Sequence, residues 1–179
     1  TRLDAAVLLS VFGGLMGWEP ADERLPDRAS EVRNAGIEGH IDVGELGFAN
    51  PNTYRLTLDN RREQHALTAI STGGGAIEVV EIDGFEVSIA GDYAETLIYV
   101  DSEGQAIADN LCRAIKTDEI LVHTAAAGEL VECKGQEFVQ PTVLEAVERE
   151  YDVRCVKRLS PVVPILSRVG LQIPFAACE

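Results

Sequence analysis

Alternation of apolar and polar residues changes its period along the chain and predicts an α+β fold. Apolar residues at helical spacing predict helices over residues 4–16 and 27–34. Period-two alternation then predicts strands over residues 37–43, 53–58, 64–70, 78–82 and 85–89. The pair Asp83-Gly84, between the last two strands, is typical of a hairpin turn. Helices followed by antiparallel strands indicate one α+β module over residues 1–92.

From Ala94 onward the order of the elements is different. The pattern predicts strand, helix, strand, strand, helix and strand, with Ser102 capping the first helix and Pro141 beginning the second. Strands are expected at 96–100, 120–124 and 153–159, and helices at 102–116 and 141–150. The remaining strand is expected at 129–133, with 137–139 on the other side of a Lys134-Gly135 turn. This order is the split βαβ arrangement, which we expect over residues 93–159.

Residues 160–179 contain three prolines and little periodicity, which predicts a linker or docking tail. Within it, the segment 162–175 is rich in apolar residues. Exposure of that segment would leave a large apolar patch. We therefore expect a partner chain or a second copy of this chain to cover it, which makes a homo-oligomer one of the open alternatives.

Composition and charge narrow the classes of partner. Apolar residues make up 46% of the 179 residues and charged residues 25%, as is ordinary for a globular protein. The net charge of −15 argues against binding to nucleic acid and to anionic membrane surfaces, which both require basic faces. No apolar run has the length needed to span a bilayer. The sequence therefore predicts no nucleic-acid partner, no membrane partner and a cytoplasmic location.

Cysteine and histidine are too dispersed to predict a metal site. The four cysteines form no Cys-x-x-Cys pair, and no histidines cluster near them. We expect free thiols, as in a cytoplasmic protein, and no iron–sulfur cluster bound by this chain alone. The three histidines, His40, His65 and His123, each lie beside a predicted strand and are interpreted as structural or solvent-facing.

Three consecutive glycines separate two predicted strands, in the segment Ser71-Thr72-Gly73-Gly74-Gly75. Glycine costs conformational entropy, and a tight turn needs at most two such residues. Without side chains, the backbone N–H groups of this glycine loop can converge on an anion, and the hydroxyls of Ser71 and Thr72 can add to the cradle. The alternative is a wide turn or bulge that binds no ligand.

Three short segments, in order, resemble bacterial iron–sulfur L-serine dehydratases. Residues 71–87 resemble that family's Ser-x-Gly-Gly-Gly segment, and Asn50-Pro51-Asn52-Thr53 resembles its His-Pro-Asn-Thr segment. Residues 17–25 resemble the acidic Asp-Glu-Arg segment that follows the first helix of those proteins. The set resembles the family's beta subunit, or beta-like domain.

The resemblance implies a fold and a reaction. It implies a serine dehydratase beta-like domain over residues 1–92 and a degenerate ACT-like module over 93–159, in which residues 101–104 loosely resemble an Asp-x-x-Gly turn. The family converts L-serine to pyruvate and ammonia with a [4Fe-4S] cluster as Lewis acid. That cluster, and its cysteine ligands, are expected on an alpha subunit or a following catalytic part, which is the implied partner.

The resemblance also implies substrate-binding residues but no catalytic residue. The candidates are Asn52, Thr53, Ser71, Thr72, Gly73, Gly74 and Gly75. Asn52 and Thr53 either bond the glycine loop or a ligand, or form an Asx-type turn around Pro51. Asn50 stands where the family has histidine, and two of the family's segments, Ser-Ser-Ser-His-Thr and Gly-His-Gly-Thr-Asp, are not found in the sequence. We therefore expect the chain to be inactive alone.

Two other functional classes stay open. The first is a regulatory domain that binds an amino acid or another small anion, because the allosteric domain of related phosphoglycerate dehydrogenases also resembles the first part of the chain. The second is a structural subunit whose glycine loop is an empty turn.

Overall fold

The computed structural model describes residues 14–17, 34–40, 42–44, 46–48, 50–74 and 76–162. Contacts between residues separate the chain into two units, 1–47 and 48–179. The helices predicted over 4–16 and 27–34 lie mainly outside the described residues, and so does the apolar tail beyond Val162. The candidate segment at 17–25 lies outside them except for Gly17.

The strand predicted over residues 37–43 is wrong for the part of it that the structure describes. Residues 37–40, 42 and 43 have no strand conformation, and the side chain of Val43 is 64% exposed. Glycine weakens a strand; Gly36, with φ of 73°, precedes this run, and Gly39 lies within it. The alternating apolar residues therefore gain no buried face from a strand here.

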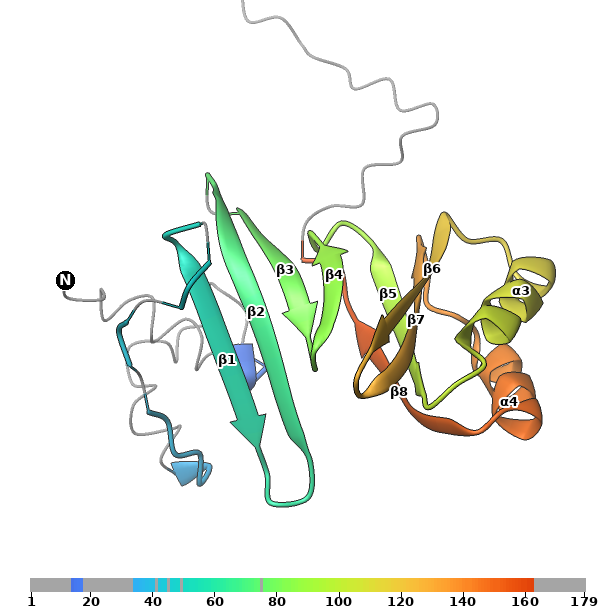
Figure 1. Cartoon of the computed structure of the whole chain (residues 1–179), viewed down its shortest axis with the longest axis horizontal. Coiled ribbons are helices and arrows are strands. Elements are labelled where there is room, and N and C mark those ends of the chain that lie inside the picture. Colours follow the sequence, from blue (N-terminus) through green and yellow to red (C-terminus); the bar gives the residue numbers. More distant parts are fainter. Residues whose placement is uncertain are drawn as a thin grey trace, which may run out of the picture. The chain divides into compact units, whose positions relative to one another are not determined.

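The second unit contains two four-stranded antiparallel sheets (Figure 1). The first sheet is a meander in the order β1-β2-β3-β4, formed by β1 Thr53–Asp59, β2 Gln64–Gly73, β3 Ala76–Ile82 and β4 Phe85–Ile89. The second has the order β6-β7-β5-β8, and its elements are β5 Ala94–Val100, α3 Gly104–Ala114, β6 Glu119–Ala125, β7 Gly128–Gly135, α4 Pro141–Glu150 and β8 Val153–Leu159. The predicted α+β class and split βαβ order are confirmed. The predicted boundary at 92/93 lies between these sheets, and its status as a domain boundary stays a prediction.

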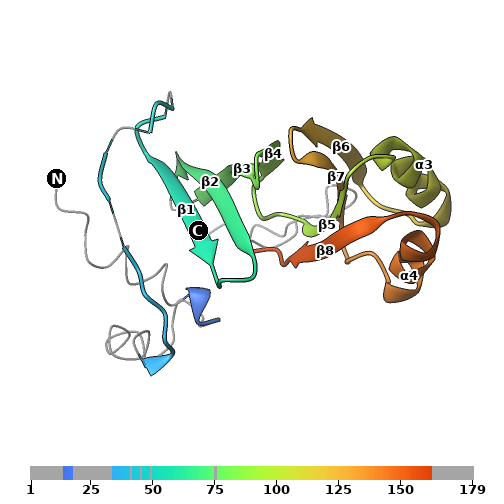
Figure 2. The ribbon, with the colours of Figure 1, turned by 60° about the horizontal axis from the view of Figure 1, so that its bottom comes forward.

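The second sheet is buried on both faces. Helices α3 and α4 cover one face (Figure 2), where the core consists of Ile98, Val100, Ile107, Ala108, Leu111, Val131, Cys133, Val139, Leu144 and Val147. The other face packs against β3 and β4 of the first sheet, through Ile82, Phe85, Val87, Ile89, Leu97, Tyr99 and Leu130. We call this second packing region the sheet–sheet contact. At its centre the rings of Phe85 and Tyr99 meet edge to face, with centroids 5.9 Å apart.

The cap predicted for the first helix of the split βαβ arrangement is wrong. Helix α3 begins at Gly104, after Glu103 in the left-handed conformation with φ of 70°, and Ser102 does not cap it. Instead, the Gly104 N–H donates to Oε2 of Glu129 on β7, at 2.7 Å. A carboxylate also suits the positive end of the helix dipole. The cap therefore comes from a distant residue, which local sequence patterns do not reveal.

The predicted Lys134-Gly135 turn is also wrong. Both residues lie in β7, which pairs with β5 on one side and with β6 on the other, and residues 137–139 form no strand. Lys134 lies opposite Glu95 on β5 and Glu119 on β6. Pairing on both sides extends the central strand through a Lys-Gly pair that, read alone, favours a turn. No helix among the described residues is long and apolar enough to cross a membrane.

Candidate functional site

The glycine loop forms the tip of the β2–β3 hairpin. Gly73 pairs with Ala76, so the connection between the strands consists of Gly74 and Gly75, of which Gly75 lies outside the described residues. Gly73 and Gly74 have φ of 98° and 63°, in the region that favours glycine. The register shifts between Ser71 and Gly73, which places a bulge at Thr72. The turn and bulge account for two of the glycines without a ligand.

The pairing of β1 with β2 brings the Asn50–Thr53 segment to this tip. Thr53 pairs with Ile70, so the start of β1 lies beside the end of β2. The Ser71 N–H donates to the Asn52 carbonyl at 2.9 Å, and Asn50 Nδ2 donates to the Ser71 carbonyl at 3.2 Å. The backbone of Ser71 is therefore held on both sides by a segment about twenty positions earlier, which the β1–β2 pairing makes adjacent.

The same segment contains the Asx-type turn that was one of the two alternatives. The Asn52 N–H donates to Asn50 Oδ1 at 2.8 Å, and the Thr53 hydroxyl donates to the Asn50 carbonyl at 2.6 Å. Thr53 thus uses its hydroxyl proton within the turn. Asn50, which was not among the predicted site residues, contributes more contacts to the tip than Thr53 does. The signal for it was present in the Asn-Pro-Asn-Thr segment.

The remaining side chains of the tip are accessible. Thr72, Gly73, Gly74 and Asn52 are exposed, and Ser71 is half-buried. Hydrogen bonds between described residues do not engage the side chains of Ser71, Thr72 or Asn52. A Cβ added at Gly73 or Gly74 would meet nothing within 4 Å. The tip can therefore present hydroxyl, amide and backbone groups outward.

Charged side chains are not part of this tip. The segments 50–53 and 70–77 contain no Asp, Glu, Lys, Arg or His. An amino-acid ligand carries both a carboxylate and an ammonium group, and the tip offers it only neutral dipoles. Groups from another chain or domain are needed to complete such a site and to move a proton.

Metal ligands are not assembled in the described part of the chain. No group of three or more His, Cys, Asp or Glu side chains converges there. Cys112, Cys133 and Cys155 are free thiols, and Cys178 lies outside the described residues. An iron–sulfur cluster requires several thiolates at one place. These residues do not fit such a cluster, and we assign no step of a reaction on this chain to it.

The histidines of the second unit lie in the sheet–sheet contact and not at the tip. His65 Nδ1 is 3.0 Å from Asp83 Oδ2, Lys157 Nζ contacts the other ring nitrogen, and Tyr99 donates to the same Asp83 oxygen at 3.1 Å. Burial and the neighbouring Asp83 raise the pKa of Tyr99 well above its usual range. These contacts join three strands and a turn, which agrees with a structural role for His65.

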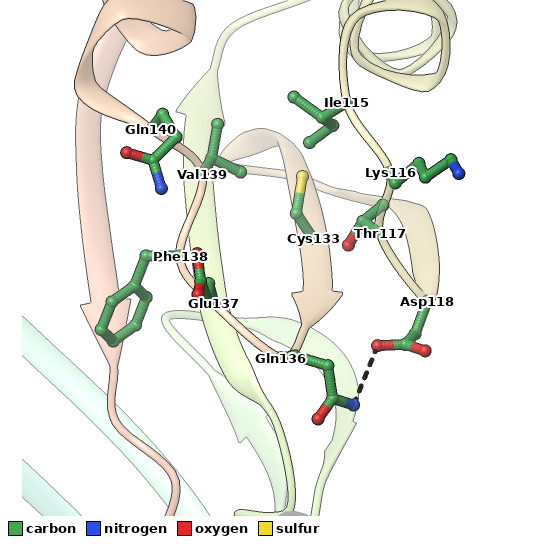
Figure 3. A pocket seen from close by; sticks show the side chains of 10 residues that line it. All are labelled: Ile115, Lys116, Thr117, Asp118, Cys133, Gln136, Glu137, Phe138, Val139 and Gln140. Carbon is green, nitrogen blue, oxygen red and sulfur yellow. Dashed lines mark hydrogen bonds between the residues drawn. The ribbon is translucent and has the colours of Figure 1, made fainter. Parts of the chain in front are cut away.

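A separate cavity of about 520 Å³ lies at one end of the second sheet (Figure 3). It is bounded by residues 115–118, which follow α3, and by residues 136–140, which precede α4. Gln136 Nε2 donates to Asp118 at 3.3 Å across one side. Burial raises the pKa of the Cys133 thiol in its wall to about 12, so this thiol is protonated at neutral pH and a poor nucleophile. None of the predicted site residues lines this cavity.

Comparison with known proteins tests the predicted resemblance. No family model matches the chain. A probable L-serine dehydratase beta chain of Bacillus subtilis is 31% identical over 90 residues, which are 50% of this chain and 41% of that protein. This chain is similar to L-serine dehydratase beta chains. The predicted resemblance is thereby confirmed.

A second relative supports the same similarity. The L-serine dehydratase beta chain of Peptoniphilus asaccharolyticus is 28% identical over 92 residues, which are 50% of this chain and 41% of that protein. In both relatives, the chain spans less than half the length of the beta chain that it matches.

Proposed function

We propose that this chain is the beta-like component of an iron–sulfur L-serine dehydratase and that it is inactive alone. The observation that carries the proposal is the similarity of half the chain to two L-serine dehydratase beta chains. The word "beta" in both names implies an alpha chain beside it. The proposed partner is therefore a cluster-bearing alpha subunit or domain, and the proposed location is the cytoplasm, where free thiols persist.

The proposed reaction converts L-serine to pyruvate and ammonia. The α-proton and the hydroxyl leave as water, and the resulting enamine tautomerises to an imine. Water then adds to the imine carbon and ammonia leaves, so one water is released and one consumed. These steps require a base and an activator of the hydroxyl. We assign neither to this chain, because the tip has no titratable side chain.

The proposed role of this chain is to bind the substrate through the β2–β3 tip. The carboxylate of L-serine would accept hydrogen bonds from backbone N–H groups at residues 72–74, which are exposed, and from the hydroxyl of the half-buried Ser71. Asn50 supports this role because it bonds the Ser71 carbonyl and fixes the backbone beside those groups. The alpha part would supply the charged groups that recognise the ammonium.

The second unit offers a specific reason to keep a regulatory function as the alternative. The order β6-β7-β5-β8 with two helices on one face is that of the split βαβ arrangement. We propose an ACT-like regulatory role for residues 93–159 within the complex. In the alternative, the chain binds an amino acid or another small anion and takes no part in catalysis.

One reconstitution separates these two functions. The chain is purified without oxygen together with the cluster-bearing alpha chain of the same source, and pyruvate formation from L-serine is measured for each chain alone and for the mixture. We expect pyruvate from the mixture and none from this chain alone. Full activity of the alpha chain without this chain would contradict the catalytic role. Tight binding of L-serine to this chain in the absence of the alpha chain would favour the regulatory alternative.

A further inference from the structure

Two glutamates are buried in the sheet–sheet contact. Glu95 on β5 is 1% exposed and Glu132 on β7 is 0% exposed. Glu95 lies opposite Lys134 and Glu132 lies opposite Leu97, so the two carboxyls are diagonal neighbours on the face that packs against the first sheet. Glutamate is almost never fully buried unless it is paired.

The contacts of the two carboxyl groups are unequal. Glu132 Oε2 lies 2.6 Å from His123 Nε2, and Glu132 Oε1 lies 3.4 Å from Lys134 Nζ. Among the described residues, both oxygens of Glu95 have no hydrogen-bond partner, and neither has Glu132 Oε1. The Lys134 ammonium donates to the Ser88 carbonyl on β4 at 2.6 Å and so also bonds the opposite sheet.

Charge balance in this cluster favours one proton on the carboxyl pair. Two carboxylates would face one ammonium, Lys134, which donates to the Ser88 carbonyl and forms an ion pair with Glu132 without a hydrogen bond. Asp92, before β5, adds further negative charge near Glu95. On β8, Lys157 shares this face of the sheet but contacts His65. On β6, His123 is engaged by Glu132. From the first sheet, the Ser88 carbonyl accepts from Lys134, and a carbonyl cannot donate to Glu95.

We propose that Glu95 and Glu132 share one proton and form a proton-dependent lock between the two sheets. With Glu95 neutral, the cluster holds one carboxylate against one ammonium, and β3 and β4 remain packed against the second sheet. Loss of the shared proton places two carboxylates together in a buried contact, and the contact weakens. The first sheet also carries the β2–β3 tip, so proton occupancy acts on the sheet that bears the candidate site. This lock does not depend on the proposed function.

The raised pKa of Glu95 places the loss of the shared proton at mildly alkaline pH. Burial, together with the neighbouring carboxylates of Glu132 and Asp92, raises the pKa of Glu95 to about 8, against the opposing effect of Lys134. The ordinary value of 4.5 applies to the unfolded chain. Between these values the folded chain holds a proton that the unfolded chain has lost. Stability from this group is therefore complete below pH 4.5 and is lost progressively as the pH rises through about 8.

The test is the pH dependence of unfolding in wild type and Glu95→Gln. Glutamine keeps the shape and has no proton to lose. From pH 5 to 8, the unfolding equilibrium constant of the wild type should rise relative to that of the variant, by up to about tenfold per pH unit. Glu148→Gln, at an exposed position on α4, is the matched control and should retain the wild-type slope. If the unfolding equilibrium constants of wild type and Glu95→Gln had the same dependence on pH, the proposal would be overturned.

A second measurement needs no variant, in case Glu95→Gln fails to fold. The side-chain carboxyl carbon of Glu95 is followed by NMR while the pH of the wild type is varied. A midpoint near 8 supports the shared proton, and a midpoint near the ordinary value of 4.5 overturns it. Amide exchange at Val87 and Ile89 on β4, corrected for intrinsic rates, should lose protection across the same midpoint. Unchanged protection there would overturn the lock.

Discussion

The β2–β3 tip and the sheet–sheet contact are opposite in almost every physical property. The tip is accessible, carries no charge and is shaped by backbone hydrogen bonds and positive φ angles. The sheet–sheet contact is buried and contains the carboxyl, ammonium and imidazole groups. Perturbed titratable groups often mark a functional site, but here they lie away from the accessible polar surface. In this molecule, perturbed acidity therefore marks an internal contact, and the proposed binding site depends on neutral dipoles.

This contrast predicts that damage to the contact lowers the free energy of unfolding. Phe85 is 1% exposed and packs against Tyr99, so Phe85→Ala leaves a cavity in the sheet–sheet contact. We expect a loss of about 3–5 kcal/mol in the free energy of unfolding, measured by urea denaturation. Ile77→Ala, at a side chain that is 49% exposed, is the control and should cost far less. Equal losses for both variants would contradict the assignment of the contact as a core.

Removal of the buried ammonium tests the charged part of the same contact. Lys134→Met leaves Glu132 buried with His123 as its remaining partner, and we expect a loss of roughly 3–5 kcal/mol. Because Lys134 lowers the pKa of Glu95, its removal should also move the Glu95 midpoint upward from about 8. Urea denaturation and carboxyl NMR measure the two effects. The control Lys116→Met, at an exposed position, should change neither quantity. If Lys134→Met also changed neither the stability nor the Glu95 midpoint, the ammonium would not be coupled to the carboxyls.

At the tip, a substitution should affect ligand binding more than stability. Gly74 has φ of 63° with open space around it, so Gly74→Ala costs stability through backbone conformation alone, on the order of 1 kcal/mol. Its larger effect is expected on L-serine binding in the assembled complex, because the local N–H groups would rotate. Thermal melts and L-serine titration measure the two. Full binding with the same modest loss of stability would identify the loop as an empty turn.

Much of the fold could be predicted because local patterns and tertiary packing agree. Asp83-Gly84 predicts a hairpin turn, and these residues adopt φ of 51° and 87° in a turn between β3 and β4. The helix beginning at Pro141 and the final strand at 153–159 likewise follow their local signals. In the helix and in the strand, the local pattern also places apolar side chains toward the core: Leu144 and Val147 are buried, and Val153 and Val156 pack against the core.

The buried cluster could not be predicted, because period-two alternation does not say what lies opposite a polar face. Glu95, Glu132 and Lys134 alternate with apolar residues as they would on a solvated face, but the first sheet covers them. At the tip, the three glycines were visible in the sequence, and so was the Asn-Pro-Asn-Thr segment. Their hydrogen bonds depend on the pairing of β1 with β2, which no local pattern specifies.

The most direct test of the central claim is the affinity of the assembled complex for L-serine with and without the Ser71 hydroxyl. Titration of the wild type, Ser71→Ala and the control Thr57→Ala, at an exposed position on β1, measures it. The proposed role predicts that Ser71→Ala weakens binding by roughly 1.5–3 kcal/mol, the value of a hydrogen bond to a charged group, while Thr57→Ala binds as the wild type does. Equal affinity of all three proteins for L-serine would contradict the claim that this tip binds the substrate.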